Sequence, residues 1–271
     1  MTSAAENTKR RFRPRFFLET EGTASVAVSP AAAGDLITLN ADDSRYSRTV
    51  LRARPGDPCE LVLSLGEGSL PALYDCSFAQ VSVSVTVRID RRREVASPAI
   101  HLTLIQGLPQ PKLLDEVVEK GTEVGIDRFL ILPTEGSPPV PHDRLERRVE
   151  RLQRVAVAAA RQSKQLAVPA IELTSWEAVR TLLVAEQPRY SLVLEPSARA
   201  SLGERLDERL TPAAEPERVF LAVGPEGGWS EAEFERLDEL GELVSLGRRV
   251  LRTETAGSVA AAVVRFALSD W

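Results

Sequence analysis

Short apolar segments alternate with helical patterns through the last two thirds of the chain, and this alternation limits the fold more than any other feature. The strand-like segments are 99–107, 129–133, 191–196, 219–228 and 243–247. Parallel strands need long crossover connections, which are usually helices that cover both faces of the sheet. Residues 96–271 are therefore predicted to form an α/β domain with a parallel sheet between layers of helices.

The first 95 residues follow a different pattern, in which short candidate strands are separated by turns rich in proline and glycine. Residues 79–89, AQVSVSVTVRI, alternate apolar and polar side chains and predict one half-buried antiparallel strand. The other candidate strands are 24–29, 36–39, 60–65 and 70–75. This pattern predicts a small β-barrel, with the domain boundary in the charged stretch 91–98.

Composition excludes several classes of protein. The 271 residues are 43% apolar, enough for two folded cores, and no apolar run approaches the length of a membrane span. The chain has two cysteines, without a CxxC motif, and two histidines, so zinc chemistry is not expected and no metal is assigned. The N-terminus has no apolar segment typical of a secretory signal, and we expect a reducing cytoplasm.

The net charge of −5 argues against a uniformly basic nucleic-acid-binding surface, but the charge is uneven. Residues 1–95 carry 13 Lys/Arg against 12 Asp/Glu, whereas the remainder carries 21 against 27, so basic contacts are expected in the first part. A basic run near the N-terminus is either a solvated tail or an arm that contacts phosphates. Its members are Lys9, Arg10, Arg11, Arg13 and Arg15.

Three of the predicted strands end in loops rich in glycine, proline and charged residues. One loop is Gly224-Pro225-Glu226-Gly227-Gly228, and Ser230 and Glu233 behind it have the spacing of a capping box. The others lie within the segments 193–196 and 244–256. Each loop alone fits ordinary turn chemistry, but ligands bind at the carboxyl ends of parallel strands, so the three loops together predict one pocket. The spacing matches neither a phosphate loop nor a GxGxxG fingerprint.

Two of these loops carry a specific resemblance. LAVGPEGGWSEAE and VSLGRRVLRTETA closely resemble the RsmE family of SPOUT-class RNA methyltransferases, which methylates N3 of a uridine in bacterial 16S ribosomal RNA. Four further segments resemble motifs of that family, so the similarity covers nearly the whole chain. They are RPRFF (13–17), TVLRARPGD (49–57), EKGTEVGIDRFLILPTEGS (119–137) and AAARQSKQLAVPAI (158–171).

The resemblance implies a PUA-like RNA-binding β-barrel with a basic N-terminal arm in residues 1–95. It also implies a SPOUT methyltransferase domain with a C-terminal trefoil knot in residues 96–271. S-adenosylmethionine is the implied cofactor, and ribosomal RNA or the small ribosomal subunit is the implied partner. By motif match, the residues expected around the cofactor are Leu194, Glu195, Gly224, Pro225, Glu226, Gly227, Gly228, Leu246, Gly247, Leu251, Arg252, Thr253 and Glu254.

Two of these residues are the candidates for catalysis. Arg252 is expected to stabilise the anion that develops at uridine N3, or to hold the base, because a guanidinium keeps its charge at neutral pH. The alternative for Arg252 is a salt bridge to Glu254 or to a phosphate, without a catalytic role. Glu254 is a candidate proton acceptor, or else a helix cap. The residues expected to contact RNA are Arg13, Arg15, Arg52, Lys120 and Gln162.

The chain departs from the family pattern in three places on the expected RNA side. Residues 44–48 lack a histidine, Gly136 stands where the family has arginine, and residues 161–165 are altered. Two alternatives therefore remain, a methyltransferase for another rRNA or tRNA base and a non-catalytic RNA-binding relative. The intact cofactor loops favour an enzyme.

The last helix is apolar around much of its circumference, which predicts a homodimer, because one domain covers only part of a helix at the chain end. The apolar positions are Ala256, Val259, Ala260, Val263, Val264 and Ala267.

Overall fold

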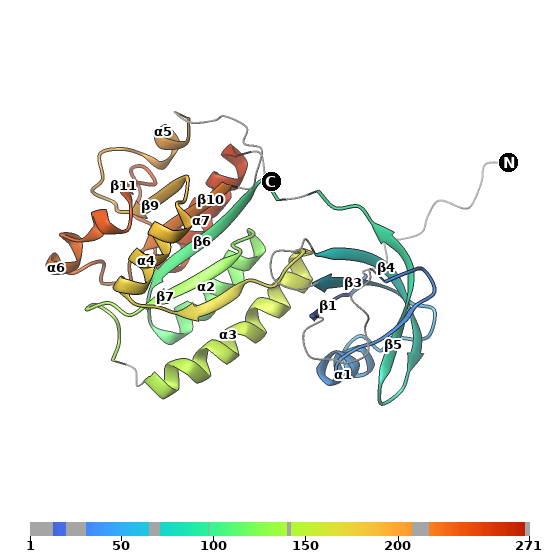
Figure 1. Ribbon diagram of the computed structural model, residues 1–271. Helices are drawn as coiled ribbons and strands as arrows, with labels where there is room; N and C mark the ends of the chain where they lie inside the picture. Colours follow the sequence, from blue (N-terminus) through green and yellow to red (C-terminus); the bar gives the residue numbers. More distant parts are fainter. Residues whose placement is uncertain are drawn as a thin grey trace. The chain divides into compact units, whose positions relative to one another are not determined.

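The computed structural model describes residues 13–19, 31–64, 71–96, 98–139, 142–207 and 217–268 (Figure 1). The chain divides into two compact units, residues 1–96 and 97–271. In the part of the chain that the structure describes, no helix is both long and apolar enough to cross a membrane. The expected strand 24–29 and the basic residues Lys9, Arg10 and Arg11 lie outside the described ranges.

The N-terminal unit contains a five-stranded sheet that curls into a half-barrel around an apolar core (Figure 1). The strand order is β1-β3-β4-β5-β2, and only the β1–β3 pair is parallel. Phe16, Leu61 and Tyr74 are among the side chains buried at its centre. The elements are β1 (Arg15–Glu19), β2 (Leu36–Thr38), α1 (Ala41–Thr49), β3 (Pro58–Ser64), β4 (Ala72–Val81) and β5 (Val85–Arg93).

The prediction of a single strand over 79–89 is wrong, because this segment is a hairpin. β4 ends at Val81, β5 begins at Val85, and these two residues pair directly. The loop of residues 82–84 has an odd number of residues, so the alternation of apolar and polar side chains continues in phase through the turn. The periodicity is therefore the same for one long strand and for this hairpin.

Helix α1 is a feature that the strand-centred prediction did not include. The side chain of Asn40 caps it by accepting a hydrogen bond from the Asp43 amide at 2.8 Å. The buried hydroxyl of Ser44 donates to the Leu39 carbonyl at 3.2 Å and accepts from the Val85 amide at 3.1 Å, which fixes the helix to the first residue of β5. The segment 44–48, where the family pattern has histidine, belongs to this helix.

The two cysteines face each other across β3 and β4. Cys59 pairs with Cys76 in the register of these strands, and both thiols are free and buried. The hydrogen bond to Cys76 and burial raise the pKa of the Cys59 thiol above its ordinary value. A thiol that stays protonated is a poor nucleophile, so Cys59 is a core residue rather than a catalytic one.

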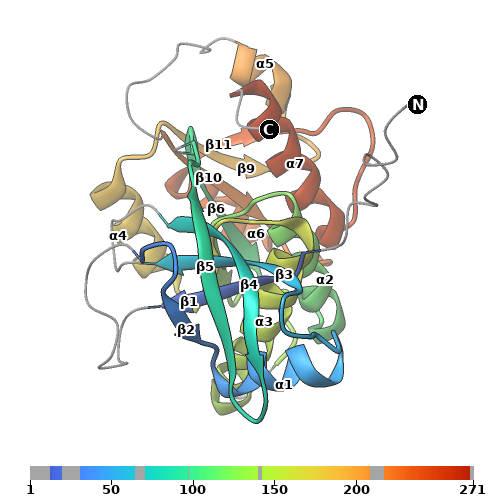
Figure 2. The ribbon, with the colours of Figure 1, turned by 90° about the vertical axis from the view of Figure 1, so that its right-hand side faces the viewer.

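The C-terminal unit contains the predicted parallel sheet, with six strands in the order β11-β9-β10-β6-β7-β8. Helices cover both faces, as expected: Figure 2 shows α4 on one side of the sheet and α2 and α7 on the other. The strands are β6 (Ile100–Gly107), β7 (Arg128–Leu132), β8 (Ala170–Leu173), β9 (Tyr190–Leu194), β10 (Glu217–Val223) and β11 (Glu242–Val244). The helices are α2 (Pro111–Glu123), α3 (His142–Ser163), α4 (Trp176–Glu186), α5 (Leu202–Asp207), α6 (Glu231–Phe234), the 3-10 turn η1 (Leu237–Glu239) and α7 (Thr253–Ala267).

The strand order brings late parts of the chain to the middle of the sheet. β10 lies between β6 and β9, and β11 lies at the edge beside β9. Helix α7 then packs on β10, β6 and α2, so residues 245–252 lead from the edge of the sheet back to its centre. This return is where the family resemblance puts a trefoil knot, which stays a prediction.

A buried arginine fixes the far end of α7. Arg265 Nε donates to the Gly125 carbonyl at 2.9 Å, and Arg265 Nη2 lies 2.9 Å from Asp127 Oδ2. The same Asp127 oxygen accepts from the Leu102 amide at 2.8 Å, which connects α7 to the beginning of the sheet. Gly125 ends α2 with φ +86, and a Cβ there would lie 2.7 Å from Arg265 Nε, so glycine serves both the turn and this contact.

Replacement of Arg265 by alanine tests this anchor. Because the change removes the guanidinium from a buried carbonyl and from a partly exposed carboxylate, Arg265→Ala is expected to lower the free energy of unfolding by about 3 kcal/mol. The three tryptophans, Trp176, Trp229 and Trp271, all belong to residues 97–271, so urea unfolding followed by tryptophan fluorescence reports on this unit. The control Lys120→Ala removes an exposed pair with Glu116 and is expected to change stability by less than about 0.5 kcal/mol. Equal effects of the two changes would contradict the assignment.

Candidate active site at the ends of three parallel strands

A cavity of about 530 Å³ lies in the C-terminal unit at the carboxyl ends of β9, β10 and β11. The cavity brings together eleven of the thirteen residues expected around a cofactor: Leu194, Glu195, Gly224, Pro225, Glu226, Gly228, Leu246, Leu251, Arg252, Thr253 and Glu254. Gly227 and Gly247 belong to the same loops but are not part of the lining.

Several lining residues were not among the sequence candidates. Leu113 comes from α2, far away in the sequence, and no local pattern connects it with the loops. Trp229 and Arg249 lie within the two recognised motifs, so their place in those motifs was the available signal. The remaining additions are Pro196, Val223, Val250 and Ala256.

The loop after β10 is a tight turn that lies against the end of β6. The Gly228 amide donates to the Pro225 carbonyl at 2.9 Å, and Gly228 has φ +71, a conformation that favours glycine. A Cβ on Gly107 would lie 2.7 Å from Pro225 Cδ and 2.9 Å from its nitrogen. Glycine at 107 therefore lets the loop approach the neighbouring strand.

The predicted capping box at the start of α6 is confirmed. Ser230 Oγ accepts from the Glu233 amide at 3.1 Å, and Glu233 Oε2 accepts from the Ser230 amide at 3.0 Å. The other oxygen of this buried carboxylate accepts from the Glu135 amide at 2.8 Å. In the residue after Glu135, a Cβ on Gly136 would lie 3.3 Å from the Gly228 carbonyl oxygen. The position where the family has arginine thus lies against the glycine-rich loop.

A buried amide joins three segments at the base of the cavity. Gln106, fully buried at the end of β6, donates through Nε2 to the Gly107 carbonyl at 2.9 Å and to Thr253 Oγ1 at 3.0 Å. The Thr253 hydroxyl in turn donates to the Gly224 carbonyl at 2.6 Å. The end of β6, the loop after β10 and the first residue of α7 are therefore held together. Gln106 does not line the cavity but positions segments that do, and the sequence candidates did not include it.

The charged groups of the cavity differ in how well they are compensated. Glu226 Oε1 accepts from the Gln110 amide at 3.0 Å, and Glu195 Oε1 accepts from Ser197 Oγ at 2.7 Å. The Glu254 side chain is only 8% exposed, and the nearest described cation, Arg252 Nη1, lies 3.9 Å from its Oε1. The Arg252 side chain is 86% exposed, so this pair is loose and open to solvent.

This combination suits an organic cation better than a metal ion. Leu194, Leu246 and Leu251 form an apolar wall, and the cavity volume is within the usual range for small-molecule sites. A buried carboxylate with a distant partner favours a positively charged ligand. Among the described residues, no group of three or more His, Cys, Asp or Glu side chains is placed to hold a metal ion.

The residues expected to contact RNA lie in both units. In the N-terminal unit, Arg13 is about half exposed beside Asp75, whereas Arg15 is 4% exposed and pairs with Glu60 at 3.0 Å. Arg52 is exposed, has φ +50 and lines a second cavity of about 290 Å³.

In the C-terminal unit, Lys120 and Gln162 are the expected RNA contacts. The Lys120 ammonium lies 3.4 Å from the Glu116 carboxylate, one turn earlier on α2. Gln162 is exposed near the end of α3. Both side chains are therefore at the surface of this unit.

Comparisons with known proteins agree with the fold and the motifs. A family profile described as an RNA methyltransferase domain matches residues 96–265. The ribosomal RNA small subunit methyltransferase E of Mycobacterium tuberculosis (strain CDC 1551) is 30% identical over 249 residues, which cover 88% of this chain and 89% of the relative. The protein of the same name from a Synechocystis species is 31% identical over 237 residues, covering 86% of this chain and 74% of the relative.

A solved structure confirms the expected fold. The crystal structure of a ribosomal RNA small subunit methyltransferase E from Neisseria gonorrhoeae, bound to S-adenosyl methionine, superposes with a TM-score of 0.72. The match covers 94% of this chain and 97% of the other at 24% identity. The combination of a curled N-terminal sheet with a six-stranded parallel sheet is thus a known architecture.

The hydroxyl of Thr253 allows a matched test of the buried hydrogen bonds. Thr253→Val keeps the shape but removes the donor to Gly224, and it is expected to cost about 1–3 kcal/mol of stability. Thr253→Ser keeps the hydroxyl and is expected to cost about 0.8 kcal/mol for the lost methyl group. Urea unfolding followed by tryptophan fluorescence measures both, and a serine variant less stable than the valine variant would show that the hydroxyl is unimportant.

Proposed function

Because this chain belongs to the RNA methyltransferase family that includes ribosomal RNA small subunit methyltransferase E, we propose that it methylates N3 of a uridine in 16S ribosomal RNA. S-adenosylmethionine is the methyl donor, and ribosomal RNA or the small ribosomal subunit is the partner. The reaction belongs in the cytoplasm, in keeping with the two free thiols. The observation that carries the proposal is the convergence of three loops, with eleven of the expected residues, on one cavity.

The lining of the cavity fits the parts of this cofactor. The apolar wall of Leu194, Leu246 and Leu251 suits the adenine ring, and the glycine-rich loop leaves backbone groups accessible to polar parts of the ligand. When bound, S-adenosylmethionine supplies a methyl group attached to a positively charged sulfur. The buried Glu254 carboxylate favours a positive charge in this pocket, because the Arg252 guanidinium lies 3.9 Å away and is largely exposed to solvent.

Arg252 and Glu254 are the side chains that assist proton removal from the base. The N3–H of uridine is a weak acid, so a fixed cation near N3 stabilises the anion that forms as the proton leaves. The exposed Arg252 guanidinium has N–H donors available for this role, and Glu254 provides a carboxylate to receive the proton. A purely structural role for the pair is not favoured, because an ion pair 3.9 Å long with one side chain 86% exposed contributes little to stability.

Methylation of 16S ribosomal RNA, free and assembled in small subunits, tests the function. The purified protein with S-adenosylmethionine is expected to produce 3-methyluridine, detected by mass spectrometry of the digested nucleosides. Methylation of a different base, or of tRNA only, would select the alternative substrate. Calorimetry with EDTA present measures cofactor binding separately, and RNA binding without cofactor binding would select the non-catalytic alternative.

In the same assay, Arg252→Ala is expected to lower the single-turnover rate by roughly 10²–10³, the typical cost of one lost electrostatic donor. Arg252→Lys should recover part of the rate, because lysine keeps the charge but lacks the planar fork. The melting temperature should stay near that of the wild type, since the side chain is 86% exposed. A folded Arg252→Ala protein with a near-normal rate would remove Arg252 from the mechanism.

We also propose that the protein is a homodimer through α7. Val259, Val263 and Phe266 are 37%, 38% and 78% exposed, and their spacing places them on one side of the helix. The adjoining face, with Ala260 and Val264, is buried within the unit. An apolar stripe beside a buried face is suited to a self-complementary contact with a second copy.

Light scattering checks the dimer. The wild-type protein at micromolar concentration is expected to have about twice the chain mass of 29.6 kDa. Phe266→Glu combined with Val263→Glu should give a monomer, because two carboxylates would be desolvated in the contact. The control Val83→Glu changes an 84% exposed residue in the β4–β5 hairpin and should leave the mass unchanged. A monomeric wild type would contradict the proposal.

A further inference from the structure

Four charged side chains form one row across the N-terminal sheet. Arg15 of β1 is opposite Glu60 of β3, Glu60 is opposite Asp75 of β4, and Asp75 is opposite Arg91 of β5. Residues opposite each other on neighbouring strands project from the same face of a sheet. The row therefore places two adjacent carboxylates between two guanidinium groups on one face.

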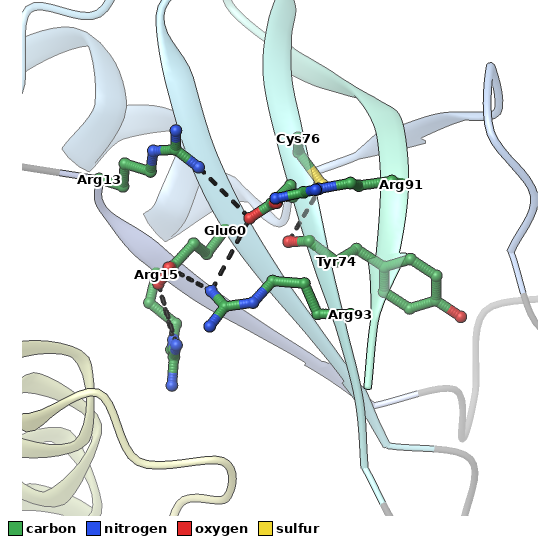
Figure 3. Close-up of polar contacts among 8 residues, drawn as sticks. Arg13, Arg15, Glu60, Tyr74, Cys76, Arg91 and Arg93 are labelled. Carbon is green, nitrogen blue, oxygen red and sulfur yellow. Dashed lines mark hydrogen bonds and ion pairs between the residues drawn. The ribbon is translucent and has the colours of Figure 1, made fainter. Parts of the chain in front are cut away.

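Glu60 receives two arginines from different strands. Arg15 Nε donates to Glu60 Oε2 at 3.0 Å, and Arg93 Nη1 donates to Glu60 Oε1 at 3.1 Å. Figure 3 shows both side chains directed at this carboxylate, from β1 and from β5. The Glu60 carboxylate is 8% exposed, so it is a fixed point for both guanidinium groups.

Asp75 holds the outer arginines. Arg91 Nε donates to Asp75 Oδ2 at 2.7 Å, and Arg13 Nη1 donates to Asp75 Oδ1 at 3.4 Å. Arg93 Nη1 also lies 3.8 Å from this carboxylate, which is 9% exposed. The two buried acids thus orient four arginines.

The cluster is unbalanced in charge and asymmetric in exposure. Among the side chains that the structure describes here, four guanidinium groups and two carboxylates have a formal charge of +2, whereas pairing two acids needs only two arginines. The side chains of Arg91, Arg13 and Arg93 are 73%, 48% and 42% exposed. Arg91 contacts Asp75 through Nε, which leaves the outer edge of its guanidinium in solvent.

This arrangement suits phosphate groups. Arginine edges held by carboxylates on their inner side are oriented before a ligand arrives, and the planar fork matches phosphate oxygens. Arg91 and Arg93 lie two residues apart on β5, about 7 Å along the strand, a spacing comparable to that of successive phosphates in an extended RNA strand.

We propose that Arg91 and Arg93, together with Arg13, bind successive phosphates of the RNA backbone, and that Asp75 and Glu60 position them. The identity of the RNA rests on the proposed function, but the phosphate site itself does not. Arg15, at 4% exposure, is then a positioning residue beside Glu60 rather than a phosphate contact.

A double variant of the full chain tests the site. Arg91→Ala with Arg93→Ala is compared with the wild type in filter binding to 16S ribosomal RNA and to polyuridylate at several salt concentrations. Loss of two phosphate contacts to single-stranded RNA should reduce the slope of log affinity against log salt by about 1.4. The matched control is Arg92→Ala, which removes an exposed arginine of the same strand from the opposite face and should have a smaller effect than either single change.

Asp75→Asn separates positioning from simple charge. The change raises the net charge by one, so electrostatic attraction alone predicts tighter RNA binding. Positioning by Asp75 predicts weaker binding, because the guanidinium groups lose their anchor. Circular dichroism shows whether the variant is folded. If Asp75→Asn does not fold, RNA binding by Glu60→Gln tests the same positioning role. Tighter binding by a folded variant would overturn the positioning role.

Kinetics distinguish this site from the proposed activity. The double variant should raise KM for RNA at least tenfold while S-adenosylmethionine affinity and kcat at saturating RNA stay near wild type. If the wild type binds RNA but transfers no methyl group, while the double variant lowers the salt slope, the proposed function fails and the phosphate site is supported. An active double variant with the wild-type salt slope would overturn the phosphate site and leave the proposed function intact.

Discussion

The buried amide of Gln106 is the interaction on which the cavity depends. Gln106 donates hydrogen bonds to Thr253 Oγ1 and to the Gly107 carbonyl, and the Thr253 hydroxyl donates to the Gly224 carbonyl. Three segments that are far apart in the chain are therefore fixed at one point. Since β10 lies between β6 and β9, the loops that follow these strands are neighbours. The cavity is the space that remains between these fixed loops and the first turn of α7.

Charge is arranged differently in the two units, and each arrangement fits a different ligand. In the cavity, the buried Glu254 has a distant partner, which favours a cationic ligand, while Arg252 extends into solvent. In the N-terminal sheet, buried Glu60 and Asp75 are paired and direct surplus arginines outward, which favours an anionic ligand. The cavity therefore suits a cationic methyl donor, and the N-terminal sheet suits a polyanionic RNA.

Much of the architecture could be predicted because the signals are local. The change from alternating strands to strand–helix units, the capping box of Ser230 and Glu233, and the glycine end of α2 each depend on residues a few positions apart. The hairpin within 79–89 could not, because a three-residue loop preserves the alternation on both sides. Helix α1 was also missed, although Asn40 provides a local cap that could have indicated it.

Periodicity along the chain was enough to predict the α/β class of the C-terminal unit, because it depends on residues a few positions apart. The family and most of the residues that line the cavity followed from the resemblance of two motifs, which are also short stretches of neighbouring residues. Which distant residues contact those loops, and how exposed each charged side chain is, depend on packing between elements that are far apart in the chain. Leu113 of α2 lines the cavity, and Gln106 at the end of β6 supports it, because the fold brings these elements beside β10, and periodicity does not encode that arrangement. Arg15 and Arg252 are both arginines in family motifs, yet packing buries one beside Glu60 and leaves the other in solvent, because exposure is set by contacts across the sheet.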